Sequence, residues 1–186
     1  MGISKMITIL LAVFFLVNSN GISASTVSFS PSESTATSGQ AFVLNIVGND
    51  FLNDVDGGGI NLAFDKAIFK VESVSVYSDL WEFLPDNGRI DNAAGVVQEI
   101  QFNTFSQHNK GTFNIASLRL TALTPGESQF LLSESQVNPF ASAGQAINPT
   151  FIAGKITVLS AVPVPAALWL MLGGLGVLGF AGKPRG

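Results

Sequence analysis

The sequence predicts an all-β fold, an antiparallel β-sandwich, between two hydrophobic ends. Three observations predict this class. Residues 26–159 contain no helical period of useful length, they divide into short runs bounded by Gly, Asn, Asp and Pro, and many runs alternate apolar with polar residues. Alternation gives a strand one apolar face, and two sheets of such strands bury these faces against each other.

The runs predict about eight or nine strands, separated by turn residues. Phe42, Leu44 and Ile46 share one face of a strand, and Ile60, Leu62 and Phe64 share one face of the next. The predicted strands, in chain order, are Val27–Phe29, Ala41–Val47, Ile60–Phe64, Phe69–Val76, Val97–Phe105, Phe113–Leu120, Gln129–Leu132 and Lys155–Leu159.

Irregularities in the pattern predict two bulges, one loop and one turn. The apolar phase slips by one residue before Val74 and again before Leu118, which is typical of β-bulges. Ser30–Gln40 is polar and is predicted to be a loop. Ser78–Leu84 carries apolar residues at helical spacing, enough for a single turn.

Composition excludes several kinds of chemistry. The chain has 186 residues and no cysteine, so disulfides, thiol catalysis and cysteine-bound metals are ruled out. Between Ser25 and Ser160 the sequence has 13 acidic and 6 basic residues, a net charge of −7. No basic patch is present to neutralise phosphates, so nucleic acid is not an expected partner.

Residues 1–25 are predicted to be an N-terminal signal peptide. Lys5 supplies a positive charge, Met6–Val17 is an apolar run of signal-peptide length, and Ser23-Ala24-Ser25 offers small residues for cleavage by signal peptidase. A membrane anchor is the alternative, and the run is short for one. The sequence therefore predicts an exported protein.

Residues 161–186 are predicted to form a sorting segment with a transmembrane helix. From Pro165 to Gly182 all 18 residues are apolar or Gly, and Lys183 and Arg185 follow. A helix of this length is about 27 Å long, close to the thickness of the bilayer hydrocarbon. The segment is predicted to hold the chain in the membrane until it is processed.

The start of this segment resembles a known sorting signal. Val162, Pro163, Val164, Pro165 and Ala166 are similar to the opening of the VPLPA form of PEP-CTERM segments, with Val164 where Leu or Glu is commoner. The resemblance implies recognition by an exosortase-like enzyme and a destination at the cell surface or extracellular matrix of a Gram-negative bacterium. A plain C-terminal anchor is the alternative.

Residues 26–160 resemble cohesin domains. Gly58–Asp65 is similar to the family's central signature, a Gly-led strand ending in an aromatic residue and Asp, and Phe69–Val76 resembles the valine-rich strand that follows. Ser38–Val47 and Gly111–Gly126 resemble flanking parts of the domain. The resemblance implies a nine-stranded jelly-roll sandwich that binds a dockerin-like module through one sheet face, and related sandwiches bind carbohydrate such as exopolysaccharide.

Two groups of residues are candidate binding sites. Tyr77 and Trp81 lie close in sequence to acidic residues and are suited to hold a sugar ring, although packing in the core is the alternative. Asp50, Asp54 and Asp56 supply oxygen atoms of the kind calcium prefers, and an ordinary turn is the alternative. The sequence predicts no cofactor, and calcium is the only one for which it offers candidate ligands.

The sequence favours a recognition protein over an enzyme. His108 is the only histidine and no G-x-S-x-G motif is present, so a Ser-His-Asp hydrolase is not expected. The favoured function is non-covalent binding of a dockerin-like or carbohydrate partner outside the cell. A matrix spacer without a ligand is the alternative. A glycoside hydrolase is a third hypothesis, for which the carboxylates are Asp79, Glu82, Asp86 and Asp91.

Overall fold

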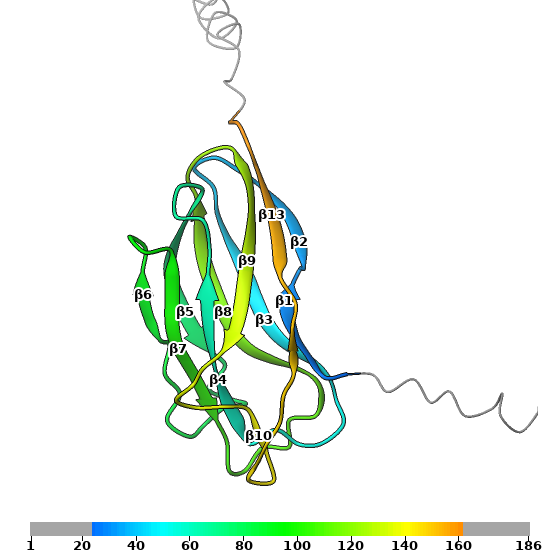
Figure 1. Ribbon diagram of the computed structural model, residues 1–186. Coiled ribbons are helices and arrows are strands. Elements are labelled where there is room, and N and C mark those ends of the chain that lie inside the picture. The colour runs from blue at the N-terminus through cyan, green and yellow to red at the C-terminus, as the bar shows by residue number, and fades with distance from the viewer. Residues whose placement is uncertain (1–23, 162–186) are drawn as a thin grey trace, which may run out of the picture.

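The computed structural model describes residues 24–161, which form thirteen strands in two facing sheets (Figure 1). The first sheet contains β1 (Thr26–Ser30), β3 (Ala41–Phe51), β5 (Phe69–Val76), β8 (Gly111–Ala122) and β12 (Thr150–Phe151). Its strand order is β12-β1-β3-β8-β5. The β-rich class predicted from the alternating runs is confirmed.

The second sheet is built around one long antiparallel group of strands. It contains β2 (Glu33–Thr37), β4 (Gly57–Ala63), β6 (Arg89–Asp91), β7 (Val96–Asn103), β9 (Gly126–Glu134), β10 (Ala141–Ser142), β11 (Gln145–Ala146) and β13 (Gly154–Leu159). Its order is β11-β10-β4-β9-β13-β2, and β7 pairs with β4 and β6.

Two strand pairs correct the expectation of a purely antiparallel sandwich. β1 runs parallel to β12 in the first sheet, and β2 runs parallel to β13 in the second. The chain passes from the first sheet to the second between β1 and β2, and again between β12 and β13. The prediction that Ser30–Gln40 is a loop was therefore wrong in part. Only Ala36 of β2 is buried, so the strand lacks an alternating apolar pattern and forms through backbone pairing with β13.

The predicted irregularities are present. The register of β5 against β8 shifts between Val71 and Ser73, and that of β8 against β3 shifts at Ile115, so both predicted bulges are confirmed. At Tyr77 the chain makes a single turn in which the N–H groups of Leu80 and Trp81 donate to the Tyr77 carbonyl, each at 3.0 Å.

The core is closed by aromatic rings that join the two sheets. Phe130 of β9 packs against Phe29 of β1 and Phe69 of β5, with ring centroids 6.0 and 5.0 Å apart. Phe140 closes the opposite end of the sandwich and lies on Gly58, where a Cβ would be 2.8 Å from its ring. Gly58 is therefore required by close packing within a strand rather than by a turn.

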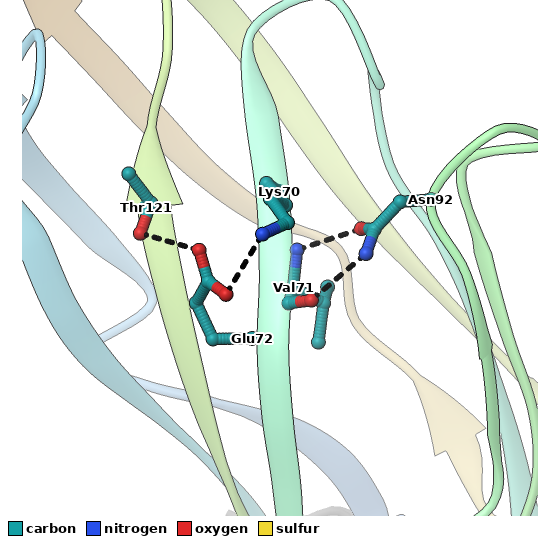
Figure 2. Close-up of polar contacts among 5 residues, drawn as sticks. All are labelled: Lys70, Val71, Glu72, Asn92 and Thr121. Atoms are coloured by element: carbon teal, nitrogen blue, oxygen red, sulfur yellow. Dashed lines mark hydrogen bonds and ion pairs between the residues drawn. The ribbon is translucent and has the colours of Figure 1, made fainter.

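The free edge of β5 is covered by side-chain amides. Figure 2 shows that Asn92 accepts a hydrogen bond from the Val71 N–H at 2.8 Å and donates to the Val71 carbonyl at 2.9 Å. Asn87 accepts from the Val76 N–H at 2.9 Å. These contacts occupy backbone groups that are otherwise free to pair with another chain.

The two predicted targeting segments lie largely or wholly outside the described residues. Within residues 24–161 no helix is long and apolar enough to cross a membrane. The signal peptide, the Val162–Ala166 motif and the C-terminal helix therefore stay predictions.

Candidate functional site

Trp81 lies in the core and has no surface for a ligand. Its exposed fraction is 0%, its ring packs between Phe102 and Phe113, and its indole N–H donates to the Asn114 carbonyl at 2.9 Å. Tyr77 is half-buried, and its hydroxyl donates to Asn45 at 3.2 Å. The packing alternative therefore describes Trp81, because a buried ring cannot stack on a sugar.

The three aspartates proposed for calcium are used separately. Asp54 Oδ2 lies 3.0 Å from His108 Nδ1, and Asp56 Oδ2 accepts a hydrogen bond from the Gly144 N–H at 2.7 Å. Asp50 is the penultimate residue of β3 and has a positive φ of 59°. Among residues 24–161 no three His, Cys, Asp or Glu side chains are grouped to hold a metal ion. Calcium binding stays a prediction without geometric support.

Three of the four carboxylates considered for glycoside hydrolysis, Glu82, Asp86 and Asp91, accept hydrogen bonds that stabilise loops. Glu82 accepts hydrogen bonds from the Phe105 N–H and the Thr104 hydroxyl, which lower its pKa from 4.5 to about 2. Asp86 and Asp91 each accept a backbone N–H two or three residues further along the chain. A general acid needs a raised pKa, so the direction of the Glu82 shift is opposite to the one that this role requires.

An apolar row crosses the outer face of the second sheet. The residues Leu131 of β9, Ala63 of β4 and Val96 of β7 are direct partners in the strand register. Each lies between or beside buried residues of its own strand, so all three side chains point outward. Leu131 is 51% exposed. We call these three residues the outer row.

The neighbours of the outer row are polar, and charged residues lie at its margin, where Asp91 of β6 pairs with Val96 and Lys155 of β13 pairs with Gln129. Asn61 and Ser133 form the next register pair, and Gln129 lies outward on β9 two residues before Leu131. Charged residues are depleted at the centres of protein interfaces, because removing a charge from water is costly. An apolar centre with polar and charged residues at its margin therefore fits a surface that is covered by a partner.

Backbone strain is held beside the outer row. Glu99 has a φ of 59° at a bulge in β7, where its N–H donates to Asn61 Oδ1 at 2.9 Å. Its carboxylate accepts a hydrogen bond from the buried hydroxyl of Ser135. A non-glycine residue in the left-handed region is costly and persists where surrounding contacts determine it. The bulge is thus fixed by one hydrogen bond to the backbone of Glu99 and one to its side chain.

On the outer face of the first sheet, the exposed residue Val43 is not part of an apolar row. Val43 of β3 is 52% exposed, nearly the same as Leu131, but its register partner is Arg119. Lys70 and Glu72 lie further out on β5 and form an ion pair at 3.0 Å (Figure 2). An exposed apolar side chain next to a cation does not extend into an apolar row, so the second sheet is the better candidate face.

Sequence reasoning did not select the outer row, although one signal was present. Phe130, Leu131 and Leu132 are three consecutive apolar residues in a strand that otherwise alternates. With Phe130 and Leu132 in the core, Leu131 must point to the outside. Its neighbours Ala63 and Val96 come from distant segments, and only the register brings them together.

Comparison with known proteins supports the fold. No protein-family model and no curated protein matches the sequence. A cohesin in a type I cohesin–dockerin complex from Clostridium thermocellum superposes with a TM-score of 0.61 at 10% identity, covering 73% of this chain and 99% of that one. The seventh ScaB type I cohesin from Pseudobacteroides cellulosolvens gives 0.58 at 17% identity, covering 76% and 96%.

The likeness extends beyond proteins solved with dockerins. A non-cellulosomal cohesin from the archaeon Archaeoglobus fulgidus gives a TM-score of 0.56 at 16% identity, covering 74% of this chain and 93% of that one. The described residues thus have a cohesin-like β-sandwich fold, as the resemblance of Gly58–Asp65 predicted. At these identities the comparisons establish the fold alone.

Proposed function

We propose that this chain is a non-catalytic binding module that recognises a protein partner through the outer row. The observation that carries the proposal is the row of three adjacent outward-facing apolar residues, Leu131, Ala63 and Val96, with charged residues only at its margin. A half-exposed leucine in such a surface contributes to binding when a partner removes it from water, at about 25 cal/mol per Å² of apolar area. The rigid bulge at Glu99 keeps the face in one shape.

The proposed partner is a dockerin-like module. A cohesin with a similar fold has been solved in complex with a dockerin. For this chain the fold and the outer row support a partner of the same kind. The partner's surface would present apolar side chains to Leu131 and polar groups to Asn61 and Gln129.

The test compares substitutions of two side chains that are almost equally exposed but lie on opposite sheets. Leu131→Asp places a charge in the outer row, whereas Val43→Asp places one on the other face. The immobilised full chain is used to capture a partner from the exterior of the producing cells, and that partner is identified. The affinity of the wild type and of each variant for this partner is then measured by titration. We expect Leu131→Asp to weaken binding by tenfold or more and Val43→Asp to have little effect.

Two results would overturn the proposal. Equal loss in both variants, with melting temperatures unchanged, would remove the outer row as the binding face. Retention of no defined partner by the wild type would favour the matrix spacer. Leu131→Ala serves as a milder variant if the aspartate lowers the melting temperature, because it keeps the strand neutral and only shortens the side chain.

We further propose export, followed by sorting through the C-terminal segment. The positive start and apolar run of residues 1–25 support the first step, and the Val162–Ala166 motif with its apolar continuation supports the second. The intact mass of the mature protein tests both. A mass without residues 1–25 and without the segment after Ala166 is expected, and one retaining Leu168–Arg185 would contradict sorting.

A further inference from the structure

An exposed aromatic pair marks the end of the sandwich where Figure 1 shows β10. Phe105 is 81% exposed, on the loop after β7. Its ring lies 4.2 Å from that of Phe83, centroid to centroid, and Phe83 is itself 40% exposed. A large ring that remains in water while a second ring supports it from one side has a free face for a ligand.

The loop that carries Phe105 is fixed by hydrogen bonds to Glu82 and to the backbone of Leu80. Glu82 accepts hydrogen bonds from the backbone N–H groups of Phe105 and Ser106, at 2.9 and 3.0 Å, and from the Thr104 hydroxyl at 2.7 Å. The buried side chain of Asn109 donates to the Leu80 carbonyl at 3.0 Å. A surface whose loops are already ordered loses less entropy when it binds.

A groove of about 830 Å³ lies directly beside the exposed ring. Phe105 forms part of its wall, and Asn53 and Asp56 approach from the loop after β3 while Gln145 approaches from β11. A smaller hollow of about 230 Å³, lined by Phe83 and Pro139, also borders Phe105. The residue thus lines two open spaces into which a chain-like ligand can extend.

The groove offers hydrogen-bonding groups and negative charge. Its polar side chains include Asn53, Asp54, Asp56, Gln107, His108 and Gln145. Among the described residues that line it, none is Lys or Arg. Carboxylates and amides accept hydrogen bonds from hydroxyl and amino groups, whereas an anionic ligand would be repelled.

We propose that this loop end is a second binding site, for a neutral or amino-bearing glycan chain. Phe105 stacks on the apolar face of one sugar ring, and Gln107 and Asp56 bind hydroxyl or amino groups of the same or the next ring. Uronate and sulfated polymers are excluded by Asp54 and Asp56. The site lies on loops rather than on the sheet face with Leu131, so it goes beyond the proposed protein binding and does not depend on it.

The test uses the full chain in a zwitterionic detergent, which has no sugar headgroup. Electrophoresis is run in gels containing a neutral glucan, a chitosan oligomer or polygalacturonate. We expect retardation by one or both of the first two polymers and none by the third. Phe105→Ala should weaken binding about tenfold, and Leu52→Ala, which removes a 77% exposed side chain outside both hollows, should leave it unchanged.

Conservative variants keep the outcome decisive. Phe105→Trp retains a stacking surface and should restore binding lost in Phe105→Ala. Glycan binding should also survive Leu131→Asp, so failure of the protein-binding proposal is distinguishable from failure of this one. Equal binding by Phe105→Ala and Leu52→Ala, preference for polygalacturonate, or no retardation by either of the other polymers would each overturn the inference.

Discussion

At the scale of single residues, Glu82 shows how a carboxylate on an exposed loop acquires a structural role. Its oxygens accept hydrogen bonds from Thr104, Phe105 and Ser106. Hydrogen bonds to the ionised form favour that form, which is why the pKa of Glu82 falls to about 2. These hydrogen bonds make Glu82 unsuited to proton transfer. The same hydrogen bonds hold Phe105 in its position.

Glu82 should make folding stability depend on pH. Because its folded pKa is lowered, the stabilisation is fully present above the ordinary value of 4.5 and is lost as the pH falls through about 2. We expect Glu82→Gln to melt at a lower temperature than the wild type at pH 7, with the difference shrinking toward pH 2. Thermal melting at several pH values measures this.

The matched control for Glu82 is Glu33→Gln. Within residues 24–161 the Glu33 side chain makes no hydrogen bond and interacts only with the charge of Lys155, so its substitution should shift the melting temperature less than Glu82→Gln does. A constant difference between Glu82→Gln and the wild type from pH 7 to 2 would contradict the role assigned to the ionised carboxylate.

At the scale of elements, the two sheets end in differently protected strands. β5 is covered by Asn92, which hydrogen-bonds the backbone N–H and carbonyl of Val71 (Figure 2). It is also covered by Asn87, which accepts a hydrogen bond from the Val76 N–H. β2, at the far edge of the second sheet, is short and begins at the charged Glu33. Short, charged or covered edges limit unwanted pairing between chains.

Removing the Asn92 amide should weaken the β5 edge. Asn92→Ala takes away two hydrogen bonds to Val71, and we expect a loss of about 1–3 kcal/mol in the free energy of unfolding. Self-association should increase, because the strand edge becomes available for pairing. Chemical denaturation and sedimentation measure the two effects.

A variant that keeps one of the two hydrogen bonds to Val71 tests the same prediction more closely. Asn92→Asp keeps the acceptor for the Val71 N–H but loses the donor to the Val71 carbonyl, so its stability should lie between those of the wild type and Asn92→Ala. Unchanged self-association of Asn92→Ala at high concentration would mean that Asn92 does not protect this edge.

At the scale of the whole molecule, the sandwich separates two candidate surfaces. The outer row belongs to strands of the second sheet, whereas Phe105 and its groove belong to loops at the end near β10 (Figure 1). Substitutions without shared contacts add in their effects on free energy.

The double variant Leu131→Asp, Phe105→Ala should therefore behave additively. Its affinity for the protein partner should equal that of Leu131→Asp alone, and its affinity for the glycan should equal that of Phe105→Ala alone. Titration of each ligand in the presence of the other completes the cycle. A change of more than about twofold in either affinity would reveal coupling between the surfaces.

Much of the fold was predictable because alternation is a local signal. Each of the eight predicted strands corresponds to an observed one, and Phe69–Val76 has the predicted bounds. The bulge near Leu118 was also visible as a change of phase. The short strands β6, β10, β11 and β12 were not predicted, because two or three residues are too few to show a period.

The candidate surfaces were less predictable, because they are made from distant segments. Trp81 and Tyr77 drew attention as aromatic residues near acidic ones, yet only the fold shows that Trp81 is buried. Phe105 was assigned to the end of a strand, and in the structure it follows β7 and stands in solvent. Exposure depends on neighbours that sequence spacing does not reveal.

The sequence by itself determined the β-sandwich class, most strands and the bulges, since these follow from which residues alternate along the chain. It also supplied the predicted export and sorting segments. The tertiary structure alone decided that β2 runs parallel to β13, that Leu131 meets Ala63 and Val96, and that Phe105 borders a groove. The physical reason is that backbone pairing and exposure are set by groups far apart in sequence, whose local composition carries no record of their partners.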